Sequence, residues 1–238
     1  MTHRTIGMIV PPANGEVPPE APAIYPEGIR FLTRGLAIDS VSIGSFDKVI
    51  DRVVQLGKEL RDEGAEAVSL MGTSLSFFRG VAFNDELTRA LHEATGLPAT
   101  TMSNGIRDAL RAVGATKVAV GTAYTDDLNE KLRTYLTDSG FKVLSLESLQ
   151  LSAVPEIHAV TLDTIVSLGE KTFESSGRRA DAVLISCGGL RATHLAPALE
   201  AKVGVPVIAS ATAGLWSTVR LLGINTRLDA FGALGRVA

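Results

Sequence analysis

The segment Ala65-Glu66-Ala67-Val68-Ser69-Leu70-Met71-Gly72 recurs 115 residues later as Ala180-Asp181-Ala182-Val183-Leu184-Ile185-Ser186-Cys187. Each copy is an apolar run that leads into a loop of small residues, which is typical of a strand buried in a parallel sheet. Downstream, Gly96-Leu97-Pro98 corresponds to Gly204-Val205-Pro206. Matching segments in the same order indicate that the chain contains two similar halves.

Short apolar runs alternate with longer amphipathic stretches along both halves. In the first half this predicts strands at 6–10, 65–71 and 97–102 and helices at 46–63, 85–94 and 104–113. In the second half it predicts strands at 117–121, 142–146, 182–186 and 205–209 and helices at 126–139, 161–175, 196–202 and 213–222. Strands that alternate with helices form parallel sheets with helices on both faces.

We therefore predict an α/β fold of two Rossmann-like halves, related by a pseudo-two-fold axis. Residues 1–114 form the first half and residues 115–238 the second, and we expect residues 211–238 to pack back on the first half. Ligands of such sheets bind beyond the carboxyl ends of the strands, so the functional cleft is expected between the halves.

Composition excludes several classes of function. The chain of 238 residues has 23 Lys and Arg against 26 Asp and Glu, a balance that argues against nucleic-acid or anionic-membrane partners. No long apolar run predicts a membrane span, and the N-terminus lacks the pattern of a signal peptide. One cysteine cannot form an intrachain disulfide or a thiolate metal cluster. We expect a cytoplasmic, monomeric protein that binds a small molecule.

The sole cysteine is the strongest candidate for chemistry. Cys187-Gly188-Gly189 follows a predicted strand and precedes a predicted helix, so backbone N–H groups can point into the cleft without obstruction. Such a nest attracts anions and can lower the pKa of a thiol. A buried, inert cysteine is the alternative.

Gly72-Thr73-Ser74 is the corresponding element of the first half and offers N–H groups and two hydroxyls. Tyr124 follows the strand predicted at 117–121 and is expected to open into the same cleft, where its phenol can donate. The alternative for Gly72-Thr73-Ser74 is a plain strand-to-helix turn without a ligand. The alternative for Tyr124 is a tyrosine in a surface loop.

Neither a metal nor a nucleotide cofactor is predicted. The four histidines share no spacing typical of metal ligands, and no Gly-x-Gly-x-x-Gly or phosphate-binding loop follows a strand. His194 lies near Cys187 in the sequence, but a Cys–His nucleophile pair is a weak alternative.

The combination of Met71-Gly72-Thr73-Ser74 with Ser186-Cys187-Gly188-Gly189 resembles arylmalonate decarboxylases, a family of the aspartate/glutamate racemase superfamily. Segments 6–12 and 122–124 share the resemblance, which extends from about residue 5 to residue 220. Racemases and maleate isomerases of the superfamily carry a cysteine in each half. Here the first-half position is Gly72, as in the decarboxylases.

The absence of a second thiol has a physical consequence of its own. A two-base racemase needs an acid on each face of a planar carbanion, whereas this cleft has Cys187 on one side and Gly72 on the other. It can therefore protonate from one face only, and a planar enediolate formed by loss of CO2 would be trapped as one enantiomer.

The resemblance implies cofactor-independent, enantioselective decarboxylation of 2-aryl-2-alkylmalonates to 2-arylalkanoic acids, with Cys187 as the proton donor. It implies that one carboxylate of the dicarboxylate substrate lies in a cradle of donors from Thr73, Ser74, Tyr124, Cys187, Gly188 and Gly189. The leaving carboxylate would lie among apolar side chains, with Pro11, Pro12 and Gly188 on the aryl side; this pocket is assigned to Val41, Phe46, Leu75, Val154 and Ile157.

The chain departs from the family pattern at two of these positions. Phe46 stands where a tyrosine is expected and Ile157 where a methionine is expected, so the pocket stays apolar while rate or substrate size can change. Two other functions remain open: a one-cysteine isomerase or racemase of the same superfamily, resembling maleate isomerase, and a non-catalytic protein that binds small carboxylates.

Overall fold

The computed structural model describes residues 3–38, 41–42 and 50–237. Its first sheet contains β1 (Arg4–Val10), β2 (Ile29–Gly35), β3 (Ala67–Leu70) and β4 (Ala99–Thr101) in the order β2-β1-β3-β4. The second sheet contains β5 (Lys117–Thr122), β6 (Lys142–Ser148), β7 (Ala182–Ser186) and β8 (Val207–Ala209) in the order β6-β5-β7-β8. All paired strands are parallel, and the two sheets share one topology. The predicted α/β fold of two similar halves is confirmed.

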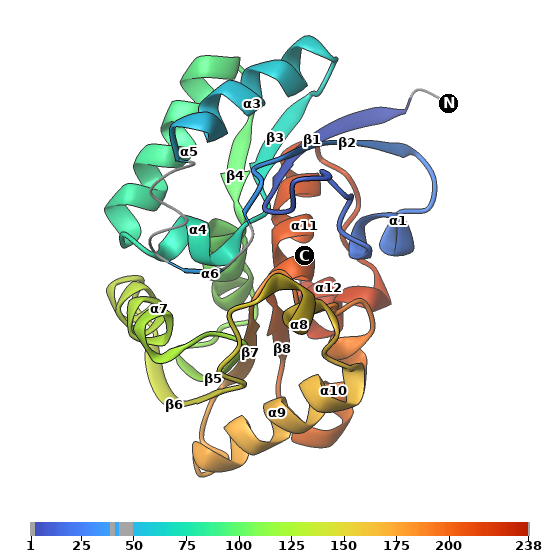
Figure 1. Cartoon of the computed structure of the whole chain (residues 1–238). Coiled ribbons are helices and arrows are strands. Elements are labelled where there is room, and N and C mark those ends of the chain that lie inside the picture. The colour runs from blue at the N-terminus through green and yellow to red at the C-terminus, as the bar shows by residue number, and fades with distance from the viewer. Residues whose placement is uncertain (1–2, 39–40, 43–49, 238) are drawn as a thin grey trace.

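Helices cover the sheets and fill the space between them (Figure 1). The helices of the first half are α1 (Glu20–Ile24), α3 (Ile50–Asp62), α4 (Thr73–Phe77), α5 (Val81–Thr95) and α6 (Met102–Ala112). The second half contains α7 (Asp126–Asp138), α8 (Val154–His158), α9 (Leu162–Ser175), α10 (Leu195–Val203), α11 (Ser210–Arg220), η1 (Asp229–Phe231) and α12 (Ala233–Val237). None of these helices, which belong to the described residues, is long and apolar enough to cross a membrane.

The segment after β8 packs against the first half. Helix α11 lies beside α6 at the centre of the molecule (Figure 1), and a Cβ on Gly105 would lie 2.6 Å from the Ala213 carbonyl oxygen, so only glycine permits this approach. Further along, the Leu222 carbonyl accepts a hydrogen bond from Arg4, and Tyr25 donates to the carbonyl of Asn225 over 2.7 Å.

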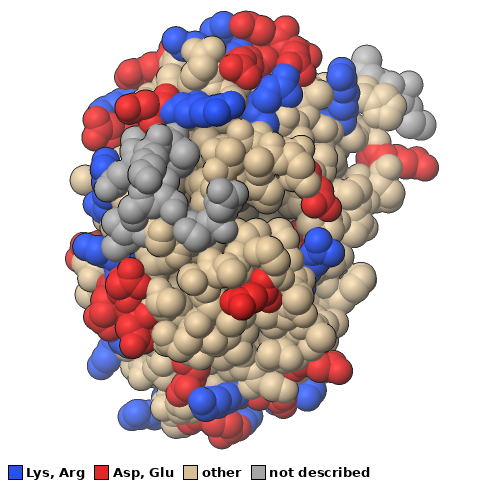
Figure 2. Space-filling view, viewed as in Figure 1, with Lys and Arg blue, Asp and Glu red and all other residues tan. Residues whose placement is uncertain are grey.

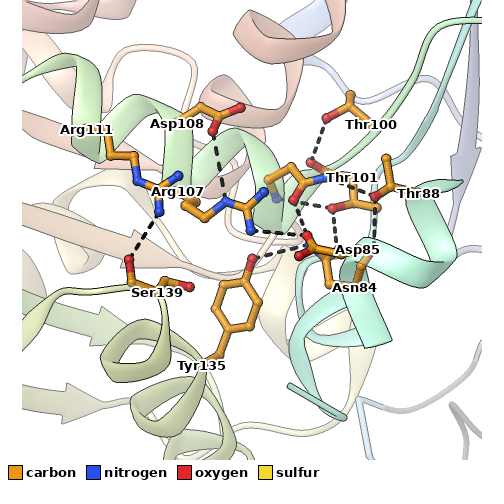
Figure 3. Close-up of polar contacts among 11 residues, drawn as sticks. Asn84, Asp85, Thr88, Thr100, Thr101, Arg107, Asp108, Arg111, Tyr135 and Ser139 are labelled. Atoms are coloured by element: carbon orange, nitrogen blue, oxygen red, sulfur yellow. Dashed lines mark hydrogen bonds and ion pairs between the residues drawn. The ribbon is translucent and has the colours of Figure 1, made fainter. Parts of the chain in front are cut away.

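A polar network also joins the halves (Figure 3). Asn84 on α5 donates to the side chain of Asn104 over 2.6 Å and lies 3.4 Å from the hydroxyl of Tyr135, which belongs to α7 of the second half. Arg107 pairs with Asp85 at 3.2 Å. Asn84, Asn104 and Tyr135 are buried, so their hydrogen bonds replace lost contacts with water, whereas Asp85 is exposed.

Several predicted boundaries differ from the structure. The strand predicted at 97–102 ends at Thr101, because Thr101 accepts a hydrogen bond from the Asn104 N–H and so caps α6, which begins at Met102 rather than at residue 104. Strand β2 was not predicted, since it is a partly exposed edge strand without strict alternation. The predicted start of the helix at 46–63 lies outside the described residues; its described part, α3, spans Ile50–Asp62.

Candidate active site

An apolar cavity lies beyond the carboxyl ends of β3 and β7, where the two halves meet. In Figure 2 the central part of this face is mostly uncharged, with a few charged side chains, and most of the charged side chains lie around its margins. The cavity wall includes twelve of the residues singled out in the sequence: Pro11, Pro12, Val41, Gly72, Thr73, Ser74, Leu75, Val154, Ile157, Cys187, Gly188 and Gly189. Phe46 lies outside the described residues.

The part of the cavity wall that the first half contributes, Gly72-Thr73-Ser74, is the start of a helix. The small residues of this segment had predicted an open loop. Gly72 is the N-cap of α4, and Thr73 and Ser74 form its first turn. The first N–H groups of a helix have no acceptor within it, so those of Thr73 and Ser74 are free to bind a ligand. Both side chains are buried, and the Thr73 hydroxyl donates to the sulfur of Met102.

Cys187 begins the corresponding segment of the second half, which does not turn into a helix. Instead the Leu190 N–H donates to the Cys187 carbonyl over 3.1 Å, and α10 starts only at Leu195. The helix predicted at 196–202 is confirmed as α10 (Leu195–Val203). His194 is exposed at the start of α10 and is not part of the cavity wall, which gives no support to a Cys–His pair.

The Cys187 sulfur is held as a thiol. Burial raises its pKa to about 11, and hydrogen bonds from the Gly189 and Leu190 N–H groups and from Tyr124 oppose this effect only in part. The N–H groups of the nest act to lower the thiol pKa, as expected, but the loss of water outweighs them and the net shift is upward. A thiol that stays protonated suits an acid better than a nucleophile.

Tyr124 does not line the cavity itself but lies against two residues that do, Thr73 and Cys187. It is fully buried, its ring meets Phe77 edge-on with centroids 5.7 Å apart, and its hydroxyl lies 3.5 Å from that of Ser186. The hydroxyl also contacts the side chains of Thr73 and Cys187, so it connects the two walls. Burial holds the pKa of Tyr124 well above its usual value, and the phenol remains a donor.

Helix α8 closes the apolar side of the cavity and lies between the halves in Figure 1. It carries Val154 and Ile157, and the segment before it is tied to the first half by a hydrogen bond of 3.0 Å from the Val41 N–H to the Ser152 carbonyl. A Cβ on Gly189 would lie 2.9 Å from Ile157 Cγ2, so the absence of a side chain at Gly189 permits this packing.

The cavity contains further residues that the sequence did not reveal. Met102 and His158 line it, as do the charged residues Glu16 and Arg191. Burial and the positive charge of Arg191 lower the pKa of His158 below its usual value. No local pattern marks these residues, because they come from four separate segments that only the tertiary fold brings together.

Glu20 supports the Cys187 loop from the first half. Its buried carboxylate accepts a hydrogen bond of 2.8 Å from the Ala192 N–H. Burial raises the pKa of Glu20, while this hydrogen bond and Arg191 act in the opposite direction. Glu20 is the first residue of α1, where a carboxylate is common in any helix, so the sequence offered no specific signal.

Fold and cavity together define the class as an α/β protein of two parallel sheets with a candidate active site between them. A maleate isomerase from Pseudomonas putida S16 has the same fold, with a TM-score of 0.91, 21% identity and coverage of 100% of this chain and 99% of that one. The family model for arylmalonate decarboxylase matches residues 6–235, and the chain belongs to that family. It is therefore a carboxy-lyase.

Two relatives illustrate this membership. The arylmalonate decarboxylase of Bordetella bronchiseptica is 46% identical over 219 residues, which cover 92% of this chain and 90% of that protein. A crystal structure of a doubly substituted arylmalonate decarboxylase in a liganded form superposes with a TM-score of 0.94 at 43% identity, covering 97% of this chain and 98% of that one.

Proposed function

We propose that the protein converts 2-aryl-2-alkylmalonates to 2-arylalkanoic acids of one configuration without a cofactor, and that Cys187 supplies the proton. The observation that carries this proposal is the asymmetry of the cavity. A buried, protonated thiol follows β7, whereas Gly72 follows the equivalent strand β3 and offers no acid.

The retained carboxylate is proposed to accept hydrogen bonds from the free N–H groups of Thr73 and Ser74 and from the Gly188-Gly189 segment. The leaving carboxylate faces Leu75, Val154 and Ile157, all of which line the cavity. An apolar environment disfavours the ionised carboxylate more than neutral CO2, which lowers the barrier to its release.

When the C–C bond breaks, its electron pair enters the retained carboxylate and forms an enediolate. Charge grows on oxygens that the donors already face, and each strong preorganised donor contributes about 3 kcal/mol to the transition state. The S–H bond of Cys187 then breaks as the C–H bond forms on the face beside the thiol. The thiolate left behind, with its raised pKa, takes a proton from water.

The test is to incubate the protein with a prochiral aryl-methylmalonate and follow CO2 release and product configuration. We expect CO2 and one enantiomer, at a rate that dialysis against EDTA leaves unchanged. The protein should not racemise a chiral 2-arylpropionate. Racemisation without CO2 release would favour the one-cysteine isomerase, and recovery of activity on adding a metal or organic cofactor would contradict cofactor independence.

A further inference from the structure

Two buried serines connect helix α4, which lines the cavity, to helix α6. Ser76 lies on α4 and Ser103 on the first turn of α6, and neither side chain is accessible to solvent. Their hydroxyl oxygens are 2.7 Å apart, and the Ser103 hydroxyl donates to the Thr73 carbonyl over 3.1 Å. The mechanism proposed above gives neither serine a role.

The Ser76 hydroxyl carries one proton and lies within hydrogen-bonding distance of three acceptors, the Ser103 hydroxyl at 2.7 Å and the carbonyls of Gly72 and Thr73 at 2.9 Å each. The Ser103 hydroxyl donates to the Thr73 carbonyl, and the Ser103 N–H donates to the Ser76 hydroxyl over 3.3 Å. The Gly72 carbonyl accepts from the Ser76 N–H over 3.1 Å. The carbonyls of Gly72 and Thr73 are therefore both held.

Holding these carbonyls also orients two N–H groups. A trans peptide is planar, so its N–H points away from its C=O, and the described chain contains no cis peptide. The Gly72 carbonyl shares a peptide plane with the Thr73 N–H, and the Thr73 carbonyl shares one with the Ser74 N–H. We propose that Ser76 and Ser103 are positioning residues that aim these N–H groups at the retained carboxylate, an inference that rests on the proposed function.

The α6 end of this connection is fixed independently. Thr101 caps α6 through the Asn104 N–H and donates to the Asn84 side chain over 2.6 Å, within the network of Figure 3. Asn84 in turn donates to Asn104. This network fixes the first turn of α6. Ser103 therefore keeps its position if α4 moves, and its hydroxyl gives the Thr73 carbonyl a fixed hydrogen-bond donor.

The charge on the retained carboxylate sets the expected effect. It bears one negative charge in the substrate and a second develops as the enediolate forms, so misaimed N–H groups cost more in the transition state than in the bound ground state. Removal of the Ser103 hydroxyl should therefore lower kcat more than it lowers carboxylate affinity.

The experiment compares Ser103→Ala with Ser145→Ala as a matched control. Ser145 is also buried and donates to a backbone carbonyl, that of Thr172, over 2.6 Å, but it lies in the second sheet away from the cavity. We expect similar drops in Tm. Ser103→Ala should lose about 10-fold or more in kcat for an aryl-methylmalonate and about threefold in affinity for 2-phenylpropanoate, whereas Ser145→Ala keeps both.

Wild-type kcat in Ser103→Ala, or equal losses of kcat and affinity, would overturn the positioning role. Ser103→Cys, which retains the size and a weak donor, should fall between the wild type and Ser103→Ala, and it serves in its place if alanine prevents folding. A wild-type protein that releases no CO2 contradicts the proposed function instead. In that case unchanged 2-phenylpropanoate affinity in Ser103→Ala overturns the positioning role separately.

Discussion

Cys187 keeps its thiol proton because its side chain is almost entirely removed from water. Only 5% of the residue is exposed, and the nearby donors do not offset the lost hydration. This balance could not be predicted from the sequence, which shows the glycines that supply N–H groups but not the depth at which the sulfur lies.

Replacing this acid tests its role directly. Cys187→Ser should fold with an unchanged Tm and lose at least about 100-fold in CO2 release, since a serine hydroxyl is a far weaker acid than a thiol. The measurements are the rate of CO2 release and thermal unfolding. A serine variant as active as the wild type would remove the thiol from the mechanism.

The raised thiol pKa predicts a particular pH dependence. The folded protein retains the thiol proton to about pH 11, whereas the unfolded chain loses it near pH 9. The stability that this group contributes is therefore fully present below about pH 9 and is lost as the pH rises toward 11.

Thiolate absorbance against pH measures this directly, because Cys187 is the only cysteine. We expect a thiolate transition with a midpoint near pH 11 in the wild type, after subtraction of the Cys187→Ser curve, which contains the tyrosine ionisation alone. A midpoint at or below pH 9 would show that the N–H donors lower the pKa of the Cys187 thiol at least as much as burial raises it.

Among the elements at the site, the strands could be predicted from the sequence, whereas the two short helices could not. The repeated strands β3 and β7 are short, buried and mostly apolar runs, and both were predicted. Helices α4 and α8 have five residues each, too few to produce a helical period, and α4 is rich in Ser and Thr. Both form because tertiary packing holds them, so the α4 N–H donors became visible only in the structure.

The packing of α8 against the Cys187 loop can be tested with a pair of glycines. A Cβ on Gly189 would lie 2.9 Å from Ile157 and 3.3 Å from His158, whereas one on Gly72 would lie 3.3 Å from Leu75 and 3.5 Å from Pro11. Gly189→Ala should therefore displace α8 and cost about 1–3 kcal/mol of unfolding free energy.

Gly72→Ala adds the same methyl group and is the control. It should cost less than about 1 kcal/mol, because its neighbours need to move only a few tenths of an ångström. Urea unfolding of both variants gives the comparison. Equal stability of the two variants would show that Gly189 is not confined by α8.

At the scale of the whole molecule, the duplication predicted the sheets and the location of the cleft. Shared strand order places the ends of β3 and β7 at equivalent positions, and Gly72 and Cys187 follow those ends. The contributions of Glu16, Met102, His158 and Arg191 could not be predicted, because they depend on how the halves meet and not on either half alone.

In the proposed mechanism, one acid on one side of a pseudo-symmetric cleft sets the configuration of the product. In the variant Gly72→Cys/Cys187→Ser the only thiol moves to the equivalent site of the first half, where the nearest neighbours of a new Cβ are 3.3–3.6 Å away and permit it. The rate should fall by about 100-fold or more, because the surrounding donors are not arranged for that geometry.

The measurement is chiral chromatography of the product formed from a prochiral aryl-methylmalonate. We expect one enantiomer from the wild type and the opposite enantiomer from the variant Gly72→Cys/Cys187→Ser. An active double variant that yields the wild-type enantiomer would contradict both the opposed-face geometry and the role of Cys187 as the proton donor.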